Sequence, residues 1–146
     1  MKNKTDTQID LAGMCQKEHP GCIVCSKTNK HGLKLSFRVS EPGAIEAEFE
    51  LDEIFQGYSD MLHGGITCTL LDEAMCQCLF SVGITAVTVE LATRFAHPVL
   101  PKVKGMIRAK IIKVHSPLYF LEAKILQNEK VLVTAKGKFC IKRTDS

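Results

Sequence analysis

Residues 64–82 carry the longest helical pattern of the chain, and this pattern limits the folds that the chain can adopt. Apolar residues recur there at spacings of three and four, as on one face of a helix: Ile66, Leu70, Leu71, Ala74, Met75, Cys78 and Val82. Because the apolar arc is broad, we expect the helix to be largely buried. Its few polar positions form a narrow line: Thr69, Asp72, Glu73 and Cys76.

Alternating apolar and polar residues, the pattern of β-strands, dominate the rest of the chain. Two such runs precede the helix, at residues 33–39 and 44–51, with turn-forming residues at 40–43 between them. About four more follow it, at residues 85–95, 103–114, 118–126 and 131–141. One buried helix against a continuous antiparallel sheet predicts an α+β fold.

The length of 146 residues fits one domain, which we expect at residues 22–146 after an N-terminal arm, loose or helical, at residues 1–21. A net charge of +3 gives no argument for nucleic acid as a partner. No apolar run approaches the roughly 18 residues of a membrane span, and the first ten residues lack the apolar stretch of a signal peptide. Seven cysteines, mostly within apolar patterns, favour reduced thiols. We therefore expect a cytoplasmic protein.

The start of the helix has features that suit acyl transfer. Gly64 and Gly65 would let a ligand approach the backbone, whose unpaired N–H groups favour negative charge on a ligand oxygen. Asp72 lies about two turns further on the same face, where it could serve as a base or nucleophile. The same residues also fit an ordinary helix that begins after a Gly-Gly turn, with Asp72 and Glu73 on its wet side.

The segment from His63 to Ala74 has the pattern HGGxxxxLxDEA and closely resembles the hotdog-fold thioesterases of the phenylacetate-degradation (PaaI) type. These form a branch of the 4-hydroxybenzoyl-CoA thioesterase superfamily. Weaker matches lie at residues 56–58, 88–91 and 94–98, and at Cys22-x-x-Cys25, and the resemblance covers roughly residues 22–142. It implies a hotdog fold, in which a curved antiparallel sheet of five to six strands wraps around one long central helix.

The resemblance also implies a function, the hydrolysis of an acyl-CoA thioester to free acid and CoA without a metal or organic cofactor. In this chain the backbone N–H of Gly64, with Gly65 beside it, would polarise the thioester carbonyl. Asp72 would be the nucleophile or the general base, His63 would orient the substrate, and Thr88 would help to position water. Relatives of this kind form homodimers or homotetramers with the site at the subunit interface, so Asp72 and Gly64 would come from opposite chains.

One departure from the family pattern keeps a second function open. Many relatives carry Asn or Gln seven residues before the glycine of the oxyanion site, and this chain has Gly57 there. Gln56 is adjacent and would have to substitute for it. The alternative is therefore an acyl-CoA-binding sensor that does not hydrolyse its ligand. A hydratase would need a different acid–histidine arrangement, which the sequence does not show.

Further residues are expected to contact the substrate, for different reasons. Basic residues after the turn at 98–101 correspond to those that meet coenzyme A phosphates in relatives. Glu73 points about 100° away from Asp72 on the helix, so it would support the site or contact a second subunit. The expected substrate contacts are Gln56, Glu73, Cys76, Phe95, Lys102, Lys104 and Arg108.

Cys22-x-x-Cys25, with Cys15, His19 and His31 nearby, offers enough nitrogen and sulfur ligands for zinc. A strong zinc pattern has a second spaced cysteine pair, and the remaining cysteines lie in helix or strand patterns instead. We therefore expect no metal, and we expect loop cysteines that pack against the sheet edge. A zinc site and a redox pair remain as alternatives.

Overall fold

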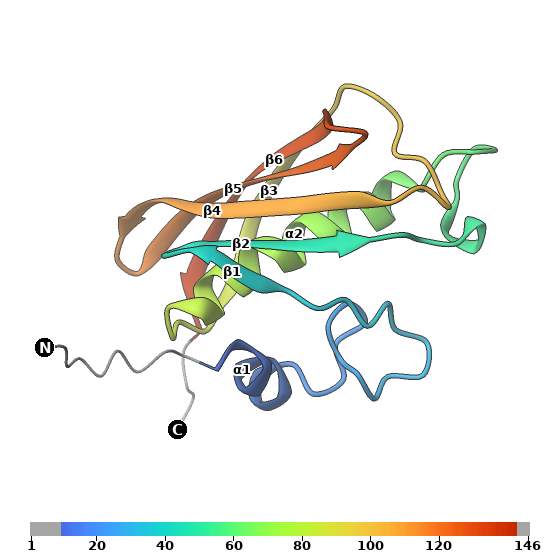
Figure 1. Cartoon of the computed structure of the whole chain (residues 1–146). Coiled ribbons are helices and arrows are strands. Elements are labelled where there is room, and N and C mark those ends of the chain that lie inside the picture. The colour runs from blue at the N-terminus through green and yellow to red at the C-terminus, as the bar shows by residue number, and fades with distance from the viewer. Residues whose placement is uncertain (1–9, 143–146) are drawn as a thin grey trace, which may run out of the picture.

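The computed structural model describes residues 10–142 as one antiparallel sheet packed against one long helix (Figure 1). Residues 1–9 of the expected N-terminal arm lie outside this description. The elements follow in chain order: α1 (Leu11–Glu18), β1 (Arg38–Glu41), β2 (Ala44–Phe49), the 3-10 turn η1 (Glu53–Phe55), α2 (Gly64–Ser81), β3 (Ala86–Phe95), β4 (Gly105–His115), β5 (Leu118–Gln127) and β6 (Lys130–Ile141). The predicted α+β class is confirmed.

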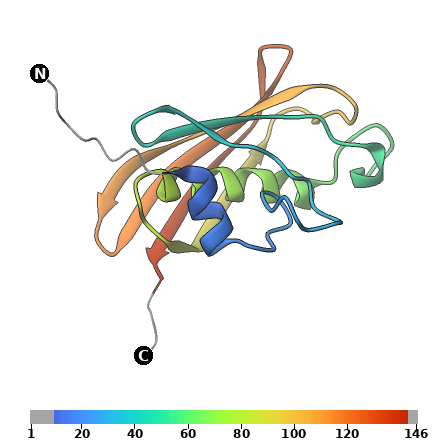
Figure 2. The same ribbon diagram turned by 60° about the horizontal axis from the view of Figure 1, so that its bottom comes forward.

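The six strands lie in the order β1-β2-β4-β5-β6-β3, and every neighbouring pair is antiparallel. β2 pairs with β4 because the chain between them forms α2 and then crosses to the far edge, where β3 pairs with β6. Figure 2 shows the sheet curving over α2, with α1 on the other side of the helix. This arrangement makes β3 an edge strand beside the central helix.

The core lies between α2 and the sheet, as the broad apolar arc of the helix predicted. The fully buried side chains of α2 are Thr67, Leu70, Leu71, Ala74, Met75, Gln77, Cys78, Leu79 and Phe80. They pack against buried residues of β2, β4, β5 and β6, such as Ile45, Ile107, Ile125 and Phe139. Val82 is 42% exposed because the helix ends at Ser81, and Gly83 follows with a φ of +78° that glycine adopts without strain.

The segment 33–37 differs from the prediction, because it is not part of the sheet. The backbone N–H groups of Leu33 and Leu35 donate to the carbonyl oxygens of Ile23 and Val24, at 2.7 and 2.8 Å. These bonds tie the segment to the loop before it, and β1 begins only at Arg38. Alternation alone cannot show which partner a backbone segment takes. The N-terminal segment of residues 10–37 thus forms its own layer against α2.

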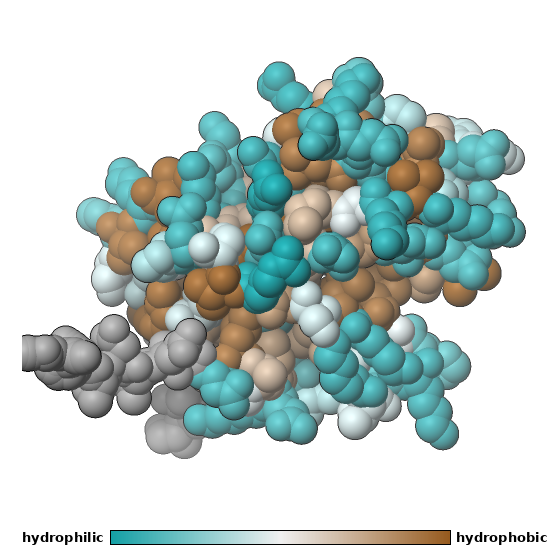
Figure 3. Space-filling model, viewed as in Figure 1, coloured by the Kyte–Doolittle hydropathy of each residue, from teal (hydrophilic) through white to brown (hydrophobic). Residues whose placement is uncertain are grey.

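The surface on the side shown in Figure 1 carries hydrophilic residues interspersed with hydrophobic ones (Figure 3). Ion pairs link neighbouring strands of the sheet, such as Arg108 with Glu46 and Lys110 with Glu122. Within residues 10–142, no helix is long and apolar enough to cross a membrane.

Replacing Gly105 with alanine is expected to lower the free energy of unfolding by about 1–3 kcal/mol, through overpacking. An added Cβ would overlap the ring of Phe49 on the paired strand and lie 2.9 Å from the carbonyl oxygen of Leu126. Chemical denaturation measures the change. The control is Gly21→Ala, because nothing lies within 4 Å of its added Cβ. Equal stability of the two variants would contradict the close contact between β2 and β4.

Candidate active site

The first turn of α2 presents an unpaired backbone N–H at Gly64. His63 is the N-cap residue of α2. Its Nδ1 accepts a hydrogen bond from the backbone N–H of Gly65 at 2.9 Å, and its carbonyl oxygen accepts one from the N–H of Thr67 at 3.0 Å. A helix leaves its first N–H groups without intrahelical acceptors. Across residues 10–142, no protein group accepts the N–H of Gly64. Gly64 is therefore the donor that a ligand can use, and Gly65 is already bonded.

A pocket of about 590 Å³ lies against this helix start. Its walls come from residues 57–64 and 95–99, together with Thr67. A Cβ on Gly64 would lie 3.6 Å from Cζ of Phe95, so the aromatic ring covers one side of the Gly64 backbone. The positive end of the helix dipole faces the same space. The pocket can hold an apolar group next to a carbonyl oxygen.

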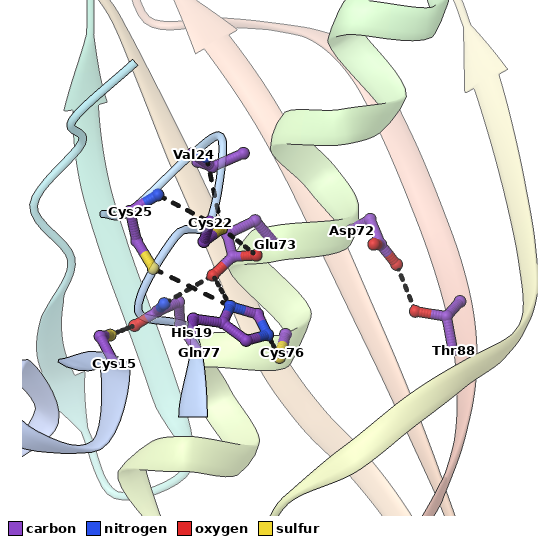
Figure 4. A network of polar contacts seen from close by, with 10 residues as sticks. All are labelled: Cys15, His19, Cys22, Val24, Cys25, Asp72, Glu73, Cys76, Gln77 and Thr88. Atoms are coloured by element: carbon purple, nitrogen blue, oxygen red, sulfur yellow. Dashed lines mark hydrogen bonds and ion pairs between the residues drawn. The ribbon is translucent and has the colours of Figure 1, made fainter. Parts of the chain in front are cut away.

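Asp72 lies further along α2, where it bonds the edge strand. Thr88 on β3 donates its hydroxyl proton to Oδ1 of Asp72 at 2.6 Å (Figure 4). The half-buried carboxylate is held by this bond and keeps its other oxygen free of protein contacts among the hydrogen bonds of residues 10–142. An oriented carboxylate with a free oxygen can accept a proton from water or attack a carbonyl carbon.

Gly64 and Asp72 are too far apart to act on one carbonyl group within a single chain. Eight residues of helix span about 12 Å, and Asp72 does not line the pocket at the helix start. Asp72 follows Gly65 by about two helical turns, which puts these two residues on one face, but the rise along the axis separates Asp72 from the helix start. Within one chain, Asp72 and the N–H of Gly64 therefore do not face the same space.

Glu73 faces away from Asp72, toward the N-terminal segment (Figure 4). The Glu73 side chain is only 5% exposed. Its Oε2 accepts a hydrogen bond from Nε2 of Gln77 at 2.7 Å and lies 3.2 Å from Nδ1 of His19. Burial raises the pKa of the Glu73 carboxyl, and the bonds from His19 and Gln77 oppose that shift. The structure does not bring Glu73 to the pocket at Gly64. Its neighbours come from a segment more than 50 residues earlier in the chain.

Thiols and one imidazole surround Glu73. Hydrogen bonding to Cys22, to Cys76 and to Glu73 raises the pKa of His19 to about 12. Hydrogen bonding from Cys25, from His19 and from two backbone N–H groups lowers the pKa of Cys22 to about 3. A hydrogen bond with the thiol of Cys15 is the largest cause that raises the pKa of Cys25. These shifts share one cause, the hydrogen bonding of thiols, imidazole and carboxylate within a single cluster.

The structure assembles part of the zinc-like set that the sequence suggested. His19, Cys22 and Cys25 come together, as the zinc alternative requires, and His31 is not among the clustered groups. The thiol of Cys15 instead donates a hydrogen bond to Oε1 of Gln77, with Sγ 3.1 Å from that oxygen. The sequence reasoning missed Glu73 as a member of this cluster, because it expected Glu73 to support the candidate active site or to contact a second subunit.

The other expected substrate contacts are scattered. Phe95 lines the pocket, whereas Cys76 is buried beside His19. Lys102 pairs with Glu53 at 3.3 Å, and Arg108 pairs with Glu46 on the sheet. Lys104 and Arg108 border a different hollow of the sheet surface. In one chain, none of the three basic residues lines the pocket at Gly64.

Gln56 does not occupy the position that Gly57 leaves empty. Its Oε1 accepts the backbone N–H of Asp60 at 3.3 Å, within the turn that precedes α2. Gly57 lines the pocket, and Gln56 does not. A Cβ on Gly57 would lie 3.3 Å from Cα of His63, so the backbone is packed tightly here. The pocket therefore lacks a side-chain amide at this point.

The antiparallel sheet around one long helix, with an open helix start, defines a hotdog protein. A family model described as "Thioesterase superfamily" matches residues 60–134, and the chain belongs to this superfamily. No curated protein matches the chain. The family and the solved structures below confirm the predicted hotdog fold.

Three solved structures illustrate this likeness. A thioesterase superfamily protein is 19% identical with a TM-score of 0.78, and the match covers 96% of this chain and 68% of that chain. The E. coli PaaI protein from the phenylacetic acid degradation operon is 17% identical with a TM-score of 0.71, over 76% and 81%. A Streptococcus mutans protein bound to acetyl CoA is 15% identical with a TM-score of 0.70, over 77% and 91%.

His63→Ala is expected to lower the free energy of unfolding by about 1 kcal/mol, because the N–H of Gly65 loses its capping acceptor. His63→Asn should retain most of the stability, since an asparagine oxygen can cap the same N–H. Chemical denaturation of the three proteins measures this difference. If His63→Ala and His63→Asn lost equal stability, the side chain would not act as the cap.

Proposed function

We propose that the chain hydrolyses an acyl-CoA thioester to the free acid and CoA. The observation that carries this proposal is the unpaired N–H of Gly64 at the start of α2, which faces a pocket of about 590 Å³. A thioester oxygen bound there would gain negative charge as the carbonyl carbon becomes tetrahedral. A fixed N–H and the positive end of the helix dipole would stabilise that charge.

Asp72 supplies the second part of the chemistry. As a general base, its carboxylate takes a proton from water, the hydroxide oxygen adds to the carbonyl carbon, and the C–S bond breaks as the carbonyl reforms. As a nucleophile, the carboxylate adds to that carbon and expels the CoA thiolate, and water then cleaves the mixed anhydride. In both routes a proton from water ends on the departing sulfur, so CoA leaves as the thiol and Asp72 is regenerated as a carboxylate. The hydrogen bond from Thr88 would orient the carboxylate for either route.

The complete site is proposed to lie between two copies of the chain. Gly64 and Asp72 lie about 12 Å apart along α2. A second chain is therefore needed for both residues to reach one carbonyl group. β3 is a ten-residue edge strand, and Val87 and Val89 on it are 50% and 53% exposed. Such an apolar edge strand offers unpaired backbone groups for pairing with another strand. A homodimer joined near β3 would cover this edge and supply Asp72 to the partner's helix start.

The choice of acyl-CoA as ligand rests on two supports. The Streptococcus mutans structure with the same fold holds acetyl CoA. In this chain Lys104 has no ion-pair partner among residues 10–142, and it borders a hollow with Arg108. Lys104, Arg108 and Lys102 are the proposed contacts for the coenzyme A phosphates, where cationic side chains give charge-assisted bonds.

A non-catalytic acyl-CoA sensor is the second candidate, and one observation favours it. The pocket has Gly57 at the position where an amide side chain would help to hold water, and Gln56 is bonded within its own turn. Thiol release from a panel of short, long and aromatic acyl-CoAs separates the two functions. Tight binding of acyl-CoA without thiol release would identify the sensor.

Asp72→Asn is expected to lower kcat/KM for thioester hydrolysis by about 10²–10⁴-fold, because the amide can neither accept a proton from water nor act as nucleophile. Thiol release with a chromogenic reagent measures the rate. Thr88→Val should cause a smaller loss, since it removes only the bond that orients the carboxylate.

The control for this prediction is Asp10→Asn, which also converts a carboxylate to an amide. Asp10 is exposed, makes no side-chain capping bond, and lines neither the pocket at Gly64 nor the hollow at Lys104. It should retain the activity of the natural chain. Full activity of Asp72→Asn would refute the assigned role even if the chain proved to be a thioesterase.

Mixing two inactive variants tests the shared site. Gly64→Pro deletes the critical N–H at the first helical position, where proline is well tolerated, and Gly64→Ala keeps that N–H as the control. We expect Gly64→Pro to lose about 10²–10³-fold in kcat. Co-refolded Gly64→Pro and Asp72→Asn chains should regain activity, because one site of each mixed dimer combines an intact Gly64 with an intact Asp72. No recovery in demonstrated mixed dimers would contradict a site shared between chains.

A further inference from the structure

Four side chains on the opposite side of α2 from Asp72 converge on one point (Figure 4). They are His19, Cys22, Cys25 and Glu73, and one donor atom of each lies within 4.8 Å of all the others. The imidazole follows the end of α1, the two thiols lie in the loop after it, and the carboxylate comes from α2. Cys25 and Glu73 are buried, and His19 and Cys22 are half-buried. None of them lines the pocket at Gly64.

The distances between these donor atoms fit a tetrahedral metal site. Nδ1 of His19 lies 3.2 Å from Oε2 of Glu73 and 3.9 Å from Sγ of Cys25, and Sγ of Cys22 lies 3.5 Å from Oε1 of Glu73. Zinc bonds of about 2.0–2.3 Å in tetrahedral geometry place ligand atoms about 3.3–3.8 Å apart. Small movements of the side chains would therefore centre an ion among the four.

The surrounding groups orient the four ligands. The backbone N–H groups of Val24 and Cys25 point to Sγ of Cys22, at 3.3 and 3.5 Å, an arrangement that stabilises a thiolate. Nε2 of His19 lies 3.9 Å from Sγ of Cys76, which leaves Nδ1 directed at the cluster. Gln77 donates to Glu73 at 2.7 Å. Outer hydrogen bonds of this kind fix the orientation of metal ligands.

We propose that His19, Cys22, Cys25 and Glu73 bind one Zn²⁺ ion in a closed structural site. Thiolate and imidazole ligands favour zinc over calcium or magnesium, which prefer oxygen alone. Two thiolates and one carboxylate carry three negative charges, and the ion neutralises two of them. Protons on the thiols, and the proton on the His19 nitrogen that becomes a ligand, are released to solvent on binding. Because four protein ligands fill a tetrahedral ion, no position remains for a water or a substrate.

The ion would tie the N-terminal segment to the helix of the candidate active site. Three ligands belong to residues 19–25, and the fourth is the neighbour of Asp72 on α2. The ion would add to the apolar contacts of this segment, which include buried Val24 and the ring of His19, packed edge-on against Phe80 at 5.0 Å. The site is independent of thioester hydrolysis, since it lies on the other side of the helix.

Metal analysis of the natural chain tests the proposal directly. Tag-free protein is purified in a thiol reductant, incubated with zinc sulfate, dialysed and analysed for metal by mass spectrometry. We expect one equivalent of zinc per chain, removable by a strong chelator with loss of thermal stability. With cobalt(II) in place of zinc, thiolate-to-cobalt charge-transfer absorption should appear. Substoichiometric zinc after this loading, or a Cys22–Cys25 disulfide in the reduced preparation, would overturn the proposal.

Two variants and a matched control separate metal binding from folding. Cys22→Ser combined with Cys25→Ser should abolish the zinc equivalent and the cobalt charge-transfer band. Glu73→Gln keeps the side-chain shape, and it should weaken zinc at least tenfold in competition with a chromogenic chelator while the circular dichroism spectrum is retained. Cys140→Ser removes a half-buried cysteine outside the cluster and should change neither measurement. Unchanged zinc affinity in folded Glu73→Gln would exclude the carboxylate as a ligand and overturn the four-ligand site.

Discussion

The packing of α2 into the curved sheet is the constraint on which the other features of the structure depend. The buried arc of the helix meets β2, β4, β5 and β6, so its polar side chains can leave the core only along its two flanks. Neighbouring residues on a helix point about 100° apart. Asp72 therefore reaches the edge strand β3, and Glu73 reaches the N-terminal segment. One helix thus supplies carboxylates to two separate chemical environments.

The two flanks are closed in different ways. On the flank of Glu73, the N-terminal segment covers the helix and supplies polar partners, so that no buried side-chain nitrogen or oxygen within residues 10–142 lacks a hydrogen bond. On the flank of Asp72, a single threonine bonds the carboxylate and β3 keeps an exposed apolar edge. Because exposed apolar edge strands favour pairing, the difference explains why the proposed shared site and the proposed metal site lie on opposite sides of α2.

The sequence predicted the fold well, because hydrophobic periodicity reports burial directly. The helix from Gly64, its end near Gly83 and the strands after it all follow from that pattern. The prediction was wrong for residues 33–37, since an extended segment can bond a loop as readily as a sheet. In the candidate site, the sequence pointed to the open helix start and to Asp72, and their spacing already implies a rise of about 12 Å between them. Only the structure shows that Asp72 bonds Thr88 and does not line the pocket at Gly64.

What the sequence by itself determined is the long buried helix, the set of strands and the family to which the pattern at His63–Ala74 points, because these depend on local periodicity and residue type. What only the tertiary structure decided is which partner each polar side chain takes. Glu73 meets His19 across 54 residues of chain, and Asp72 meets Thr88 across 16. Such contacts depend on how the layers stack and not on spacing along the chain, so adjacent carboxylates that look alike in the sequence come to lie in different sites.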